Sequence, residues 1–139
     1  MGKIIATIEL TNTDDTSFAG AGYIEENDVR RHAMAAVVDT GSVMLALPED
    51  VVKHLGLGAL EPVTVVYADD RKETRAVAGP VTVRVEGRAM ITECVVLPPL
   101  SEALIGQILL ERLDLIADCQ QQRLYPRPES PLRPLLSLK

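Results

Sequence analysis

The chain has 139 residues, of which 47% are apolar and 24% are charged, and its formal net charge is −6. This length fits a single domain with a core of its own, and the apolar share excludes a chain that is disordered throughout. The negative charge excludes nucleic-acid binding, because affinity for phosphates requires clustered Lys and Arg, and the near-absence of aromatic residues favours a β-rich aliphatic core.

The N-terminal segment MGKIIATIEL has neither the long apolar core nor the cleavage site of a signal peptide. No stretch approaches the roughly 20 apolar residues of a membrane span. Cys94 and Cys119 lie far apart in the sequence and, without an export signal, are expected to be reduced core thiols. We therefore expect a cytoplasmic protein that does not associate with membranes.

Short apolar segments bounded by polar turns predict strands along most of the chain. In chain order, the expected strands cover residues 3–10, 22–25, 31–38, 43–47, 61–68, 74–87, 89–97, the apolar stretch that ends at 118, and 122–126. Residues 11–20 are polar and rich in turn-forming residues, so they are expected to form a loop.

Two short helices are expected between these strands. Pro48 occupies the first position of one, which has acids at its start, Lys53 and His54 near its end, and Gly56 as its stop. The second helix follows Gly106.

One strand alternates clearly between apolar and polar residues. Val81, Val83 and Val85 lie on one face, which is therefore expected to face the core, and Gly87 and Arg88 are expected to form the next turn. Many short strands with one or two short helices predict an all-β barrel or sandwich.

The last part of the chain, residues 126–139, contains four prolines and cannot hold regular structure for long. Its leucines are expected to pack against the barrel, the alternative being a segment that binds a partner. These leucines are Leu132, Leu135, Leu136 and Leu138.

Residues 37–55 read VVDTGSVMLALPEDVVKHL and place Asp39 between two apolar runs. A lone buried carboxylate costs several kcal/mol unless a partner pairs with it or shares its proton. Asp39 therefore either caps a turn or lies at the centre of a site. The isolated His32 and His54 lack a third ligand, so no metal site is expected, and Ser42 lacks the nucleophile-elbow pattern of a serine hydrolase.

Three features occur in order along the chain: VVDTGS at 37–42, the hairpin VTVVYADDRKETRAV at 63–77, and LIG at 104–106. A Pro-headed helix ending in Leu-Gly-Leu, residues 47–57, follows the first of them. This pattern resembles the retropepsin-like aspartic proteases, and most of all their bacterial single-domain members. The resemblance covers nearly the whole chain.

The resemblance implies a protease domain over residues 1–125, followed by a Pro/Leu-rich tail over 126–139. It implies a closed all-β acid-protease barrel with one or two short helices. The activity would be that of an aspartic endopeptidase, in which two carboxyls share one proton and activate a water. Because the chain has one Asp-Thr-Gly segment, it supplies half a site and would work as a homodimer, without a metal or organic cofactor.

Residue roles follow from the resemblance position by position. Asp39, Thr40 and Gly41 would form the catalytic triplet, with the Thr40 hydroxyl reaching across the dimer and Ser42 donating to the outer carboxylate oxygen. The expected substrate contacts are Ser42, Val43, Met44, Tyr67, Ala68, Asp69, Asp70, Ile105 and Gly106. The hairpin 67–75 would be the flap that closes over the substrate.

The dimer contacts implied by the resemblance lie near the chain ends, where residues 3–10 and 123–125 are candidates for a sheet between two subunits. The sequence also departs from the family pattern. Val43 and Met44 stand where retroviral members often carry acids, and Asp70 stands where the bacterial pattern commonly has glycine.

These departures keep a second hypothesis open, a dimeric peptide-binding module with little or no turnover. A third is a small structural β-protein in which Asp39 is a plain turn residue.

Overall fold

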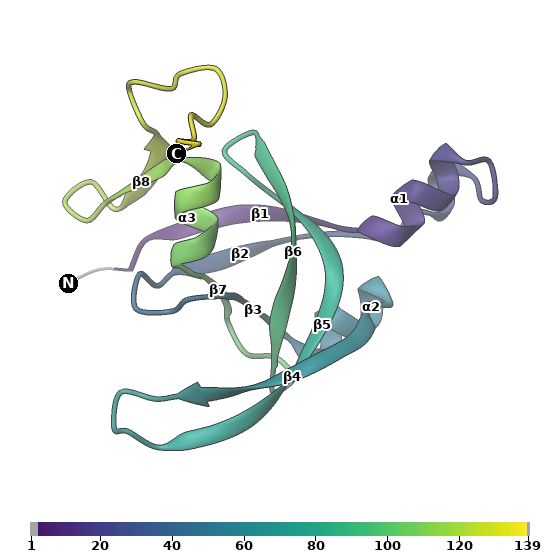
Figure 1. The fold of residues 1–139 in the computed structure, drawn as a ribbon, viewed down its shortest axis with the longest axis horizontal. Coiled ribbons are helices and arrows are strands. Elements are labelled where there is room, and N and C mark those ends of the chain that lie inside the picture. The colour runs from purple at the N-terminus through teal and green to yellow at the C-terminus, as the bar shows by residue number, and fades with distance from the viewer. Residues whose placement is uncertain (1–2, 139) are drawn as a thin grey trace.

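The computed structural model describes residues 3–138 (Figure 1). Within this range the chain forms nine strands, three short α-helices and one 3₁₀ helix. The elements are β1 (Ile5–Asn12), α1 (Thr13–Gly20), η1 (Glu26–Asp28), β2 (Arg31–Val38), β3 (Leu45–Pro48), α2 (Glu49–Leu55), β4 (Gly58–Val66), β5 (Lys72–Val85), β6 (Arg88–Leu97), β7 (Ala103–Ile105), α3 (Gln107–Leu113), β8 (Leu115–Asp118) and β9 (Arg123–Pro126). Among these residues no helix is both long and apolar enough to cross a membrane.

Six strands close into a barrel in the order β1-β2-β7-β3-β6-β5, because β5 pairs back onto β1. Strand β4 adds to the outer edge of β5, and the two form the long hairpin at the lower left of Figure 1. Strands β8 and β9 form a separate two-stranded sheet. The expected all-β closed barrel is confirmed.

Aliphatic side chains fill the barrel. Val81, Val83 and Val85 are at most 1% exposed, as their alternation predicted. Burial of each such side chain contributes about 1.5–3 kcal/mol to folding. Cys94 is also buried, which raises the pKa of its thiol to about 12. Cys119 is free but exposed in the turn after β8, so the expectation of a core thiol was wrong there.

The largest correction concerns residues 11–20, predicted to be a loop. Helix α1 occupies most of this segment, which brings the number of α-helices to three. The Asn12 side chain caps α1 by accepting a hydrogen bond from the Asp15 N–H at 3.0 Å, and its amide donates to the Leu55 carbonyl oxygen at 2.8 Å. Because α1 has no apolar stripe, periodicity gave no signal for it.

The strand expected at 22–25 is also absent. These residues form a bend that leads into η1, in which Glu25 and Asp28 cap each other's backbone. The buried carboxylate of Asp15 pairs with Arg30 at 2.8 Å and thereby fixes the start of α1 to the chain just before β2.

The start of α2 and the turn between β5 and β6 each differ by one residue from the prediction. Pro48 ends β3 and is the N-cap of α2 rather than its first residue, whereas Gly56 stops that helix in a left-handed conformation as expected. Glu86 and Gly87, with φ of 51° and 76°, form the turn expected at Gly87 and Arg88. Arg88 instead begins β6 and is buried.

The tail beyond β9 does not bury its leucines. Leu132, Leu135, Leu136 and Leu138 are 48–99% exposed, so the packing predicted for them was wrong in the single chain. Polar contacts hold the tail instead, because Arg127 pairs with Asp114 and Ser130 is buried against Arg88.

We expect Asn12→Ala to lower the free energy of unfolding by about 2 kcal/mol, because it removes the cap of α1 and leaves the buried Leu55 carbonyl without its donor. Urea denaturation followed by circular dichroism measures the change. Asn27→Ala, in exposed η1, is the matched control and should stay within about 0.5 kcal/mol of the parent. Equal effects of the two variants would contradict the role given to Asn12.

Candidate active site

The Asp-Thr-Gly segment forms a tight loop between β2 and β3. The Asp39 N–H donates to the Ile105 carbonyl oxygen at 2.9 Å, and the Ser42 N–H donates to the Asp39 carbonyl oxygen at 3.0 Å. The Gly41 N–H donates to Asp39 Oδ1 at 3.0 Å and orients the carboxylate. In the single chain Asp39 is exposed, which corrects the expectation of a carboxylate buried between apolar runs.

A second loop crosses directly behind this one. After β7, Gly106 leads into α3, and the first two N–H groups of the helix bind the Asp39 loop, which the resemblance makes the candidate catalytic loop. Gln107 donates to the Ser42 carbonyl oxygen at 2.7 Å, and Ile108 donates to that of Val43 at 3.1 Å.

Gly106 makes this crossing possible. A Cβ at this position would lie 2.7 Å from the Met44 carbonyl oxygen and 2.8 Å from that of Ser42. Real Cβ atoms do not come so close to backbone oxygens. The crossing is therefore the arrangement that the resemblance implied for Gly106.

The Ser42 hydroxyl does not reach the Asp39 carboxylate. It donates to the Met44 carbonyl oxygen at 3.1 Å, so the predicted bond to the outer carboxylate oxygen is absent in the single chain. The turn of the loop places this carbonyl two residues on, within reach of the hydroxyl, and the bond helps to fix the loop. Val43 is 64% exposed and Met44 is half-buried, so apolar surface adjoins the triplet.

The predicted flap is the end of the β4–β5 hairpin, with Ala68, Asp69 and Asp70 exposed at its tip. Asp70 has φ of 63° and its N–H donates to the Tyr67 carbonyl oxygen at 2.9 Å. The Asp69 side chain accepts from the Arg71 N–H at 3.1 Å. The turn thus forms without glycine, because Asp tolerates the left-handed conformation better than most residues do.

Side chains of the hairpin bind one another. The Tyr67 hydroxyl donates to Glu73 at 3.1 Å and accepts from Arg75 Nε at 3.3 Å, while the Arg71 guanidinium lies 4.4 Å from the Tyr67 ring centre. The hydrogen bond to Tyr67, with a smaller effect of the nearby Glu73 charge, raises the pKa of Arg75. Tyr67 therefore stiffens the base of the predicted flap.

Two pockets of about 300 Å³ open on the surface. The first lies beside Thr40, and its other lining residues were not predicted from the sequence: Gln107, Leu110, Glu111, Asp114, Leu115 and Ala117. The signal that could have found them is their position directly after Gly106. The second pocket lies at the base of the hairpin, between Thr74, Arg75 and Ala76 and the end of β6.

His32 and His54 were expected to be isolated, but they are neighbours, with ring centres 5.4 Å apart. Over residues 3–138 no three side chains of His, Cys, Asp or Glu gather closely enough to hold a metal ion.

Comparison with known families decides what kind of protein has this loop arrangement. A family model described as aspartyl protease matches residues 23–109, which include the Asp39 loop, the β4–β5 hairpin and Gly106. The chain belongs to the aspartyl protease family. No curated protein matches it. The retropepsin-like resemblance of the sequence is thereby confirmed, while the role of each aspartyl protease residue here stays a prediction.

We expect Gly106→Ala to destabilise the protein by about 3 kcal/mol, because its methyl group would press on backbone oxygens that cannot move independently. Thermal and urea unfolding measure the effect. Gly20→Ala is the control, since no atom lies within 4 Å of its would-be Cβ and its φ is not positive, and it should be neutral or slightly stabilising. A Gly106→Ala protein as stable as the parent would show that the crossing is looser than described.

Proposed function

We propose that this member of the aspartyl protease family is an endopeptidase that cleaves extended peptides, with an Asp dyad formed by Asp39 of two identical subunits. One observation carries the proposal. Asp39 is exposed on a loop whose backbone is fixed by hydrogen bonds to the β7–α3 crossing, and the chain has one such loop.

The chemistry needs two carboxyls that share one proton, because close like charges do not both ionise readily. The ionised carboxyl takes a proton from a water, which attacks the peptide carbonyl carbon. The protonated carboxyl donates a hydrogen bond to the carbonyl oxygen and so polarises the bond. The Gly41 N–H, bound to Asp39 Oδ1, holds each carboxyl in place for both steps.

The dimer would bring the exposed Asp39 and Thr40 of each subunit together and would bury upward of about 2,000 Å² in total. The Thr40 hydroxyl would then lock the two loops across the axis. Strand β9 pairs with β8 on one edge only among the described strands, which leaves residues 123–125 available for a sheet between subunits.

The other expected dimer segment needs a correction. Glu9 and Leu10 pair with β2 on one edge and with β5 on the other, so neither edge is free. The closure of the barrel takes up these residues. Pairing between subunits near the N-terminus is therefore confined to residues before Glu9.

A substrate would bind as an extended strand under the β4–β5 hairpin, held by backbone hydrogen bonds and by apolar contacts. Exposed Val43 and half-buried Met44 provide apolar surface beside the triplet, and closure of the hairpin would exclude water. The two free thiols fit a reducing compartment, as expected of a cytoplasmic enzyme.

A peptide-binding module with the same fold is the second candidate. It is favoured by Val43 and Met44, which cannot grip a substrate backbone through carboxylates, and by the non-glycine Asp70 at the flap tip. Such a module would retain extended peptides without cleaving them.

We expect the purified protein to generate new peptide termini from a diverse peptide mixture between about pH 4 and about pH 7, and Asp39→Asn to reduce this cleavage by roughly 1,000-fold or more. Mass spectrometry identifies the products, and size-exclusion chromatography reports the oligomeric state. Asp28→Asn, an exposed acid in η1, is the control and should cleave like the parent.

Retention of peptides by a dimer without any cleavage would favour the binding module. A monomeric protein that neither cleaves nor binds peptides would rule out both candidate functions.

A further inference from the structure

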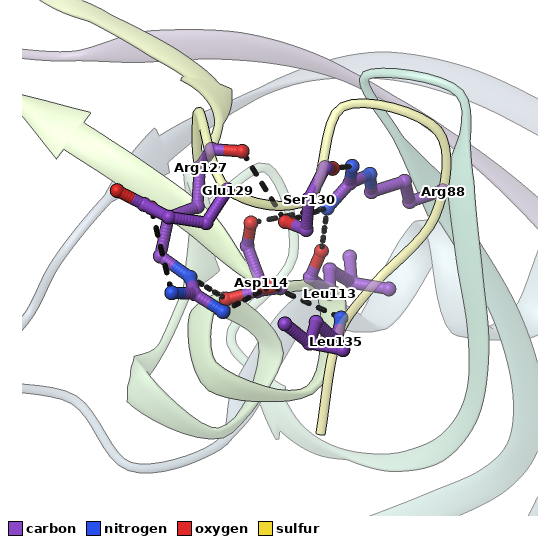
Figure 2. A network of polar contacts seen from close by, with 7 residues as sticks. All are labelled: Arg88, Leu113, Asp114, Arg127, Glu129, Ser130 and Leu135. Atoms are coloured by element: carbon purple, nitrogen blue, oxygen red, sulfur yellow. Dashed lines mark hydrogen bonds and ion pairs between the residues drawn. The ribbon is translucent and has the colours of Figure 1, made fainter. Parts of the chain in front are cut away.

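A buried arginine fastens the far end of α3 to the tail. Arg88 is 6% exposed, and its guanidinium donates to the carbonyl oxygens of Leu113 and Asp114 at 3.0 and 3.1 Å. It also binds the hydroxyl and the carbonyl oxygen of Ser130 in the tail (Figure 2). The last carbonyls of a helix have no partner within it, so one cation joins the end of α3 to the tail.

The tail is held at a second point on the same helix end. The Asp114 carboxylate receives two bonds from Arg127, at 2.8 and 3.1 Å, and one from the Leu135 N–H at 3.1 Å (Figure 2). The Arg127 hydrogen bonds hold the pKa of this carboxyl well below its usual range. Residues 127–135 therefore form a strap across the end of α3 that stays ionically closed at neutral pH.

The opposite end of α3 touches the catalytic loop. The Gln107 and Ile108 N–H groups donate to the carbonyl oxygens of Ser42 and Val43. The helix has seven residues, about 10 Å in length, and Leu109, Leu110 and Leu113 are buried. The fastened end and the loop are therefore joined by one short, packed helix.

We propose that Arg88 and the strap 127–135 are positioning elements that hold the catalytic loop in place through α3. The catalytic part of this inference rests on the proposed peptidase function. The tail would then belong to the working enzyme, although its leucines are exposed and its sequence has no regular structure. Neither Arg88 nor Arg127 needs to touch the substrate for this role.

The alternative is that Arg88 and the strap only add stability. The two roles differ in which part of the protein becomes less ordered when these contacts are weakened. In a purely stabilising role, the catalytic loop stays as ordered as the rest of the barrel until the whole chain unfolds. In a positioning role, weakening Arg88 or the strap loosens the contacts between α3 and the loop while the barrel stays closed.

Amide hydrogen exchange, measured by NMR at Gln107 and Ile108, reports these contacts directly. Arg127→Gln removes the ion pair between the strap and Asp114, and Arg88→Lys keeps the charge but removes the second nitrogen, which binds the Ser130 carbonyl oxygen. We expect both variants to exchange roughly tenfold faster at these amides, with Val83 in the barrel unchanged. Arg31→Gln, which breaks an exposed ion pair with Glu26, and Arg84→Lys, at an exposed position of β5, are the matched controls.

Peptide cleavage gives the second readout. If the strap positions the loop, kcat should fall several-fold in Arg127→Gln and Arg88→Lys, with little change in KM. Both kcat and KM should be unchanged in the controls. Unchanged exchange at Gln107 and Ile108, an equal rise at Val83, or selective loosening with full kcat would each overturn the proposal. If the parent cleaves nothing, the peptidase proposal fails by itself, while the exchange rates still decide whether the strap orders the loop.

Discussion

The crossing of two loops at Gly106 is the constraint on which the candidate site depends. Backbone oxygens of Ser42 and Met44 lie where a side chain would begin, so the two segments can approach only at glycine. This closeness lets the N–H groups of Gln107 and Ile108 reach the loop, and lets Asp39 bind Ile105 in return. The position of the carboxylate is therefore set by backbone hydrogen bonds.

A loop fixed in this way can present a charge without burying it. Asp39 is exposed in the single chain, so folding of the barrel does not bear the cost of moving a carboxylate out of water. In the proposed dimer that cost arises on association, where the twin carboxylate can share a proton. Folding and assembly of the site would then be separate steps.

Polar groups organise the regions outside the aliphatic core. Asn12 and Asp15 tie α1 to α2 and to Arg30, and Arg88 ties α3 to the tail. Each places a buried polar group against backbone carbonyls or an opposite charge. Because such groups cost stability when they lose their partners, they fix one arrangement of segments that have little apolar surface of their own.

The sequence by itself determined the features that depend on neighbouring residues. The alternation at Val81–Val85 gave the core face of β5, and acids before and Gly56 after a short apolar run gave α2. The order of the Asp39 triplet, the polar hairpin tip and Gly106 gave the family. The first two signals are local, because side-chain period and capping act within a few residues, whereas the third depends on the order of short motifs along the chain.

Only the tertiary structure decided the rest, because the contacts responsible join residues far apart in the chain. Helix α1 relies on Asn12 bound to Leu55, and Arg88 is buried because α3 and Ser130 supply its acceptors. The backbone of Asp39 is held by Ile105, a residue far along the chain. No periodicity in the sequence encodes such pairs. Sequence patterns therefore predicted the barrel and the place of the Asp39 triplet, but not helix α1, the contacts of Arg88 with the tail or the exposure of Asp39.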